Sequence, residues 1–201
     1  VAFLNLPRVE AATITEDFES GFVYWSNTTG DDMDWTRNSG GTSSANTGPS
    51  SAHSGSYYVY TEASGYAYSE AFLESEDLSS ETVNSLDFWY HMYGDTMGDL
   101  YLEYYDGSSW NTVWSKTGDQ GNSWYNATVD LSTYTVNQLR FRGVTGSSYR
   151  SDIALDDIII STGGGSTVYG SEVSFTTSSY SAPSVTTNTA SGVTETGATL
   201  N

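Results

Sequence analysis

The segment from Ser151 to Ser161, SDIALDDIIIS, constrains the fold of this chain more than any other stretch. Its apolar residues first alternate with polar ones and then run continuously, which predicts a central strand of a buried sheet. The same segment carries three carboxylates, those of Asp152, Asp156 and Asp157. Burying a carboxylate is costly unless it is hydrogen-bonded, paired with a base or bound to a cation. We therefore predict that a cation, a basic side chain or a set of backbone donors lies beside this strand. Strict alternation places Asp157 on the inward face, together with Ile153 and Leu155.

The charge and composition of the chain exclude several classes of function. Its 201 residues include 25 acidic and 6 basic side chains, for a formal net charge of −19. Nucleic-acid binding depends on clustered Lys and Arg, so we expect no nucleic-acid partner. No apolar run is long enough to cross a membrane, so we expect no direct membrane insertion. The chain has no cysteine, which excludes disulfides, thiolate metal sites and a cysteine nucleophile.

Short segments of alternating polarity recur between Gly-rich turns and predict an all-β chain. The clearest is SLDFWYHMYG at 85–94, where one face collects Leu86, Phe88, Tyr90 and Met92. Phe18, between two acids, is expected to be the buried residue of a first strand. Asp106 and Gly107 form a hairpin signal between two further segments. No ten-residue window has a convincing helical period, so we predict an antiparallel two-sheet sandwich.

The sequence predicts three parts. Residues 1–15 are a lead-in, residues 16–161 form the sandwich, and residues 162–201 are a Gly-rich linker followed by strand-like segments. The last part is too short to form a stable sheet of its own. We expect any export signal to lie outside this chain, because its start lacks a basic flank and a long apolar core.

Six fragments of the chain occur in the order that is typical of one family of extracellular modules. They are DFES (17–20), DDMDWTR (31–37), HSGSYYVY (53–60), LDFWYHMYGDTMGDLYLEY (86–104), an aromatic-rich segment (114–131) and RFRGVTG followed by SDIALDDIII (140–160). Together they resemble the MAM domain, named for meprin, A5 antigen and receptor phosphatase mu. The resemblance implies a jelly-roll β-sandwich with a non-catalytic role in adhesion or ligand recognition outside the cell. Animal MAM domains carry disulfide-forming cysteines, and their absence here points to a bacterial, cysteine-free type.

The tail resembles parts of a different family. The segment TVYGSEVSFTT (167–177) is similar to the last strand of a bacterial fibronectin-type-III-like repeat, and 182–201 is similar to the first two strands of the next repeat. The middle of such a repeat is missing. The tail therefore belongs either to a truncated domain or to strands that complete the sheet of a neighbouring subunit.

The MAM resemblance also implies a structural Ca²⁺ ion between the first and last strands of the sandwich. Calcium takes about six to eight oxygen ligands from carboxylates, carbonyls and water. The implied ligands are Asp17, Glu19, Ser54, Asp156 and Asp157. The alternative is that these acids cap turns or pair with Arg140, Arg142 or Arg150.

A second acidic group, DDMDW at 31–35, is a candidate for another Ca²⁺ loop. Its carboxylates belong to Asp31, Asp32 and Asp34. The alternative is a cluster of Asx turns that Arg37 caps.

Aromatic side chains suggest a ligand site of another kind. Flat rings with polar edges suit the faces of sugars. Trp89 and Trp110 are predicted ligand platforms, because they fall on an outward face or beside a turn. The alternative is that the rings form the core, since Leu and Ile are few.

Catalysis is not expected: no GxSxG, HExxH or Walker motif occurs, and the two histidines, His53 and His91, fall in a Ser/Gly loop and a strand.

Three hypotheses for function follow. The first is a non-catalytic adhesion or recognition module of a bacterial surface or secreted protein, with other surface proteins, copies of itself or polysaccharide as partners. The second is a carbohydrate-binding module of a polysaccharide-degrading enzyme. The third is a filament or surface-layer subunit whose terminal strands pair with the next copy.

Overall fold

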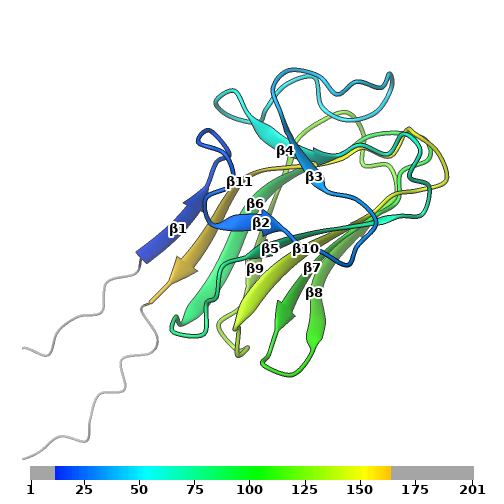
Figure 1. Ribbon diagram of the computed structural model, residues 1–201. Helices are drawn as coiled ribbons and strands as arrows, with labels where there is room; N and C mark the ends of the chain where they lie inside the picture. Colours follow the sequence, from blue (N-terminus) through cyan, green and yellow to red (C-terminus); the bar gives the residue numbers. More distant parts are fainter. Residues whose placement is uncertain (1–11, 164–201) are drawn as a thin grey trace, which may run out of the picture. The chain divides into compact units, whose positions relative to one another are not determined.

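Figure 1 shows the computed structural model of the chain, which describes residues 12–163. The predictions made for residues 1–11 and for the tail from residue 164 onward lie outside the described residues. They include the fibronectin-like strands and any exchange of terminal strands between subunits.

The described part of the chain consists of eleven β-strands and the loops between them. The strands are β1 (Ala12–Glu16), β2 (Trp25–Asn27), β3 (Trp35–Asn38), β4 (Tyr58–Thr61), β5 (Glu70–Ser75), β6 (Val83–Met92), β7 (Asp99–Tyr105), β8 (Trp110–Thr117), β9 (Tyr125–Asp130), β10 (Gln138–Val144) and β11 (Ile153–Thr162). Between residues 12 and 163 there is no helix of the length and apolarity that a membrane crossing needs. The first strand begins at Ala12, inside the segment that the sequence predicted to be a lead-in.

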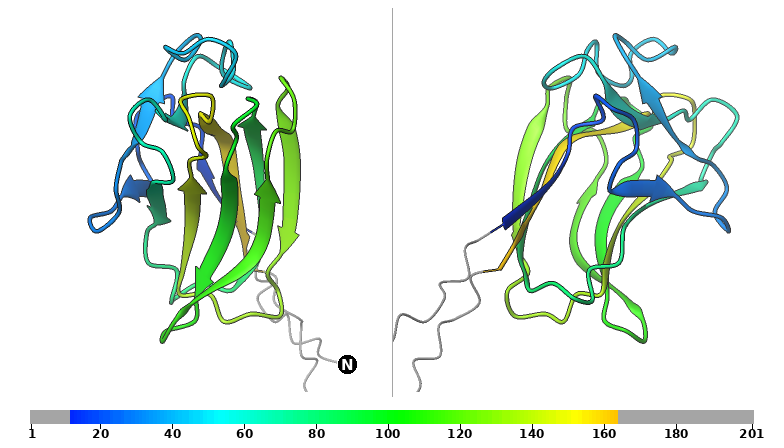
Figure 2. Two further views of the ribbon diagram at one scale, coloured as in Figure 1. Left: turned by 90° about the vertical axis from the view of Figure 1, so that its right-hand side faces the viewer. Right: turned by 60° about the vertical axis from the view of Figure 1, so that its left-hand side comes forward.

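The strands form two antiparallel sheets that pack face to face (Figure 2). The six-stranded sheet has the order β3-β4-β11-β6-β9, and β1 also pairs with β11. The five-stranded sheet has the order β2-β5-β10-β7-β8. The predicted all-β, two-sheet antiparallel sandwich is therefore confirmed.

β11 is the strand around which the six-stranded sheet is built. One side of it pairs with β6, while its other side pairs first with β4 at Ala154–Leu155 and then with β1 from Ile158 to Thr162. The change of partner coincides with a β-bulge between Asp156 and Ile159, where Asp157 has a φ of 46°. A bulge adds one residue to a strand and so reverses the facing of every residue after it.

The bulge corrects the predicted facing of the two acids. Ile153 and Leu155 join the core as predicted, but the next core residues are Ile158 and Ile160, and Asp157 does not point inward. The more deeply buried acid is Asp156, which is fully covered.

The core lies between the two sheets and contains the predicted apolar face of β6. Leu86, Phe88 and Met92 are fully buried, and Leu102 and Phe141 from the five-stranded sheet lie in the same cluster. Burying a side chain of this size contributes about 1.5–3 kcal/mol relative to leaving it exposed.

Two local predictions have different outcomes. The predicted hairpin at Asp106 and Gly107 is confirmed: it joins β7 to β8, and the Asp106 N–H donates to the Ser109 carbonyl at 3.2 Å. Phe18 is fully buried as expected, but it lies in the turn after β1 with a φ of 58°, not in a strand. Its ring reaches the core because the turn, and not strand alternation, directs it there.

The outer face of the six-stranded sheet carries a second, smaller cluster beneath the loop that precedes β4. Tyr58, Tyr60 and Ala154 are buried there, with Ala52 and Trp124 packed against them. This cover explains why β4 is buried on both of its faces.

Candidate functional site

The predicted calcium ligands gather where β11 changes its partner from β4 to β1. The Asp156 Oδ2 atom accepts the backbone N–H groups of His53 at 2.9 Å and Ser54 at 3.3 Å. The Asp157 carboxylate meets His53 Nδ1 at 2.6 Å and accepts the Ser54 hydroxyl at 2.9 Å. Burial, together with the neighbouring Asp157 carboxylate, raises the pKa of Asp156 to about 7, although its N–H donors favour the charged form.

Glu19 holds the other end of the same loop. Its Oε1 atom accepts the N–H groups of Ser56 at 2.7 Å and Tyr57 at 2.8 Å, and these bonds lower the pKa of Glu19. Gly55 has a φ of 59°, and a Cβ atom there would lie 2.4 Å from Glu19 Oε1. The positive φ favours glycine here, and any other side chain would also have to displace the Glu19 carboxylate. Asp17, in contrast, is exposed and accepts the N–H of Glu19 at 3.0 Å within its own turn.

Protein donors already occupy most of the calcium ligands that the sequence predicted. Ser54 belongs to the loop at 53–57, and Glu19, Asp156 and Asp157 contact it. The carboxylate oxygens of these three acids accept N–H and O–H donors from that loop. Within residues 12–163, no group of three or more His, Cys, Asp or Glu side chains is placed to hold a metal ion. Of the partners considered for the acids of β11, backbone donors and His53 are the ones observed. Calcium binding here stays a prediction.

The second acidic group completes the edge of the five-stranded sheet. β2 pairs with β5 only from Leu73 to Ser75. Beyond that stretch, Asp31 Oδ2 accepts the Phe72 N–H at 2.6 Å, and Asp32 Oδ2 accepts the Glu70 N–H at 2.9 Å. Asp34 is exposed. A second calcium site at these residues also stays a prediction.

Arg37 does not cap this acidic group. Its Nε donates to the Phe18 carbonyl at 2.5 Å and its Nη2 to the Glu19 carbonyl at 3.0 Å. Its guanidinium also lies 3.4 Å from the centre of the Tyr57 ring.

The two tryptophans predicted to be ligand platforms lie on different sheets. Trp89 is on the outer face of the six-stranded sheet, and the His53 ring stacks on it at 3.6 Å and 15°. One face of Trp89 is therefore already occupied. Trp110 is on the outer face of the five-stranded sheet, 5.4 Å from the Tyr105 ring. Whether either ring binds a ligand stays a prediction.

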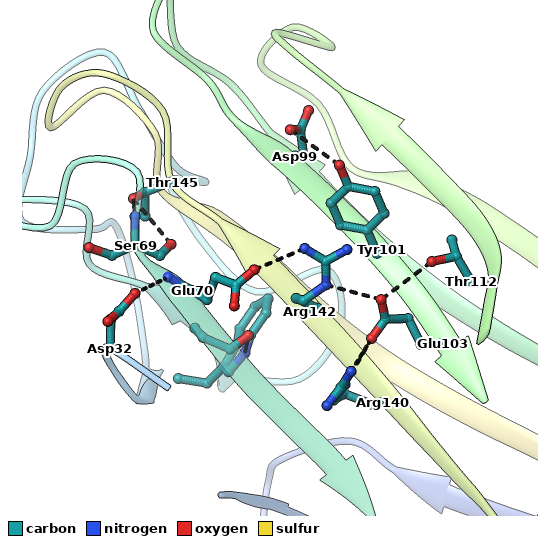
Figure 3. A network of polar contacts seen from close by, with 12 residues as sticks. Asp32, Ser69, Glu70, Asp99, Tyr101, Glu103, Thr112, Arg140, Arg142 and Thr145 are labelled. Atoms are coloured by element: carbon teal, nitrogen blue, oxygen red, sulfur yellow. Dashed lines mark hydrogen bonds and ion pairs between the residues drawn. The ribbon is translucent and has the colours of Figure 1, made fainter. Parts of the chain in front are cut away.

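The outer face of the five-stranded sheet carries rings, guanidinium groups and carboxylates. Figure 3 shows the polar network in its middle, where Glu103 lies between Arg140 and Arg142. We call this outer face the β10 face and define it by Glu70, Phe72, Glu74, Tyr101, Glu103, Tyr105, Trp110, Arg140 and Arg142. The Arg140 guanidinium lies 4.3 Å from the Phe72 ring centre and 4.2 Å from that of Trp110. Arg142 lies over Tyr101 at 3.9 Å. These are cation–π distances, and they fix the orientation of both guanidinium groups.

Glu103 joins the two arginines. Its side chain is buried, and it accepts Arg140 Nε at 2.8 Å, Arg142 Nε at 3.0 Å and the Thr112 hydroxyl at 3.3 Å. Arg142 also contacts Glu70 at 3.0 Å. These contacts hold both guanidinium groups in fixed positions on the face.

Of the residues of the β10 face, only Trp110 was predicted from the sequence to bind a ligand. The signal was present, because alternate residues of a strand share a face, and RFR at 140–142 sends both arginines to one side. What the sequence could not show is that Glu103 is the residue opposite them.

The two histidines have different surroundings. His53 contacts Asp157 as described, and His91 Nε2 lies 3.1 Å from Asn122 Oδ1. Burial lowers the pKa of His91 to about 4, so its imidazole is neutral at physiological pH.

Comparison with known proteins gives consistent matches. The sequence pattern of the MAM domain family (meprin/A5/mu) matches residues 17–164. Human MAM domain-containing protein 2 is 37% identical over 130 residues, which cover 62% of this chain and 19% of that protein. Mouse MAM domain-containing glycosylphosphatidylinositol anchor protein 1 is 33% identical over 176 residues, covering 80% of this chain and 18% of that protein. The chain thus spans about a fifth of the length of these relatives.

Solved structures show the same fold at lower identity. A cleaved adhesin domain of Lys-gingipain matches with a TM-score of 0.57 and 23% identity, covering 74% of this chain and 99% of that domain. A family 22 carbohydrate binding module from Clostridium thermocellum matches with a TM-score of 0.51 and 13% identity, covering 76% of this chain and 95% of that module. At these identities the likeness concerns the fold alone.

Proposed function

Because the chain belongs to the MAM domain family, we propose that residues 12–163 form a non-catalytic recognition module that binds its ligand on the β10 face. The observation that carries this proposal is the preorganised set of Glu103, Arg140 and Arg142 between the rings of Phe72, Tyr101 and Trp110. Aromatic and arginine side chains supply most of the binding energy at protein interfaces.

The module acts at a cell surface or in a secreted protein. The mouse relative is named for a glycosylphosphatidylinositol anchor, which attaches proteins to the outside of a membrane. The cysteine-free composition supports a bacterial member of the family. As an adhesion module, it binds a second surface protein or another copy of the chain.

A second candidate ligand is polysaccharide. The rings of Tyr105 and Trp110 favour it: they lie 5.4 Å apart and are tilted by 44°, so each could stack on the face of a different sugar residue. The Arg140 guanidinium beside them would donate hydrogen bonds to hydroxyl groups. The same face serves either ligand, so one set of variants tests both.

The test uses the full chain on beads and in solution. Beads coated with the chain are scored for aggregation, and the soluble chain is titrated with a panel of polysaccharides. We expect Trp110→Ala and Arg142→Ala to weaken whichever binding the unaltered chain shows by at least tenfold. Tyr134→Ala, in the β9–β10 loop, is the control. Binding that both variants retain would place the ligand elsewhere, and release of new reducing ends from the polysaccharides would show that the module is catalytic.

A further inference from the structure

Tyr68 adopts a backbone conformation that its side chain does not favour. Its φ is 57°, and the backbone is held there because the Tyr68 N–H donates to the Gly146 carbonyl at 3.1 Å. A non-glycine residue in this left-handed region costs about 1 kcal/mol or more. The side chain is 72% exposed, and its hydroxyl forms no hydrogen bond with residues 12–163.

Other non-glycine residues with positive φ in the described chain have a structural reason for it. Phe18 is fully buried, and Asp157 holds His53 and Ser54. Asn46 belongs to the residue type that tolerates this conformation best. Tyr68 has neither burial nor a bonded side chain. A strained, exposed aromatic residue is a reason to look for a ligand beside it.

A preformed pocket of about 400 Å³ lies beside Tyr68, at the end of the sandwich where β7 begins. Its walls include Asp95, Thr96, Asp99 and Ser147. Behind it, the fully buried Ser151 hydroxyl oxygen accepts the N–H groups of Gly98 at 3.0 Å and Gly146 at 2.7 Å.

The loops that form this pocket approach each other closely. A Cβ atom on Gly146 would lie 1.7 Å from the Thr96 carbonyl oxygen, and one on Gly98 would lie 2.0 Å from that of Val144. These close approaches pack the two loops directly against each other beside the pocket, so only glycine fits at these two positions.

The pocket combines one flat ring with several groups that bond to hydroxyls. Asp99 already accepts the Tyr101 hydroxyl at 3.4 Å, and Asp95 contacts Arg150 Nη1 at 2.6 Å. A carboxylate accepts more hydrogen bonds than these, so each keeps free acceptor capacity. The two carboxylates, on a chain with a net charge of −19, repel acidic ligands.

We propose that Tyr68 and this pocket bind a neutral sugar residue of a polysaccharide. The Tyr68 ring stacks on the apolar face of the sugar, while Asp95, Asp99, Thr96 and Ser147 bond to its hydroxyl groups. The pocket adjoins the β10 face at Asp99, which accepts the Tyr101 hydroxyl, but it contains neither Trp110 nor Arg140. The proposal does not require that the β10 face bind anything, and Trp110→Ala is the variant that separates the two sites.

The experiment titrates the full chain with soluble neutral polysaccharides (xylan, mannan, β-glucan and galactan) and with acidic polygalacturonate. We expect binding of at least one neutral polymer and none of the acidic one. Tyr68→Gly should weaken that binding at least tenfold, while the melting temperature stays the same or rises, because glycine accepts a φ of 57° without strain. Tyr68→Phe should retain the binding, since it keeps the ring. Tyr134→Ala, at a tyrosine that is 43% exposed, is the control.

Three outcomes would overturn the inference: no neutral polymer binds, polygalacturonate binds equally well, or Tyr68→Gly binds like the unaltered chain. The pattern across variants separates this site from the β10 face. Loss in Trp110→Ala and Arg142→Ala with full binding in Tyr68→Gly assigns the ligand to the β10 face and overturns the Tyr68 site. The reverse pattern supports the Tyr68 site and removes polysaccharide as a ligand of the β10 face.

Discussion

Glu103 on β7 lies directly opposite Arg140 on β10, and its carboxylate accepts hydrogen bonds from Arg140 Nε at 2.8 Å and Nη2 at 2.5 Å. The other carboxylate oxygen accepts Arg142 Nε at 3.0 Å. Glu103 is only 5% exposed, so one buried carboxylate balances two guanidinium groups. The positions of both arginines on the β10 face depend on it.

Replacing Glu103 with alanine should destabilise the domain more than the loss of any surface ion pair. The change leaves two partly buried cations without their shared partner, which costs about 2–4 kcal/mol. The free energy of unfolding in urea measures it. Glu70→Gln is the matched control: its side chain is 42% exposed, and its pair with Arg142 is worth about 1 kcal/mol or less. Equal losses in both variants would show that Glu103 has no special role.

Removal of calcium should leave the melting temperature unchanged. The carboxylates of Glu19, Asp156 and Asp157 accept N–H and O–H donors of the loop at 53–57, and these bonds need no ion. Thermal unfolding in EDTA and in added CaCl₂ is the measurement. A melting temperature that falls by several degrees in EDTA and recovers with calcium would support the ion predicted from the sequence.

Much of the fold could be predicted because alternation in the strands is strong. Leu86, Phe88 and Met92 were assigned to one face and lie in the core together. The bulge in β11 could not be predicted, because Ile158, Ile159 and Ile160 are all apolar. Either register of this run buries isoleucine, so the pattern does not show where an extra residue enters.

The candidate site was harder to predict than the fold. Acidic residues at Asp156 and Asp157 were correctly expected to need partners, but backbone donors carry no sequence signature. The pairing of Glu103 with Arg140 joins residues 37 positions apart and requires the register of β7 on β10. That register is a property of the assembled sheet, which local pattern does not determine.

Asp152 should make the domain less stable as the pH rises. Its side chain is fully buried, with Oδ1 accepting the Ala63 N–H at 3.0 Å and Oδ2 without a partner among the described residues. Burial raises its pKa to about 6. The folded chain therefore binds more protons than the unfolded chain between about pH 4, the ordinary value for Asp, and pH 6. The contribution of Asp152 to the free energy of unfolding is fully present below about pH 4 and is lost as the pH rises from there to about 6.

Asp152→Asn tests this dependence. The amide stays neutral, so the variant should gain about 2–3 kcal/mol relative to the unaltered chain between pH 4 and pH 7.5. Urea unfolding at both pH values measures the difference, with the exposed Asp34→Asn as control. A difference between Asp152→Asn and the unaltered chain that is the same at both pH values would show that folding does not raise the pKa of Asp152.

The backbone at Asp157 should make glycine a better replacement than alanine. Both variants lose the bonds to His53 and Ser54, but the φ of 46° strains alanine and not glycine. We expect Asp157→Ala to be less stable than Asp157→Gly by about 1 kcal/mol, measured by urea unfolding. Thr128, an exposed residue of β9 without positive φ, is the control, because glycine there should be the worse of the two replacements. The difference in stability between the glycine and alanine variants should therefore have opposite signs at the two positions, and this reversal measures the backbone strain at the bulge. If alanine were the more stable replacement at both positions, the backbone at residue 157 would have to leave its positive φ once the contacts of Asp157 are removed.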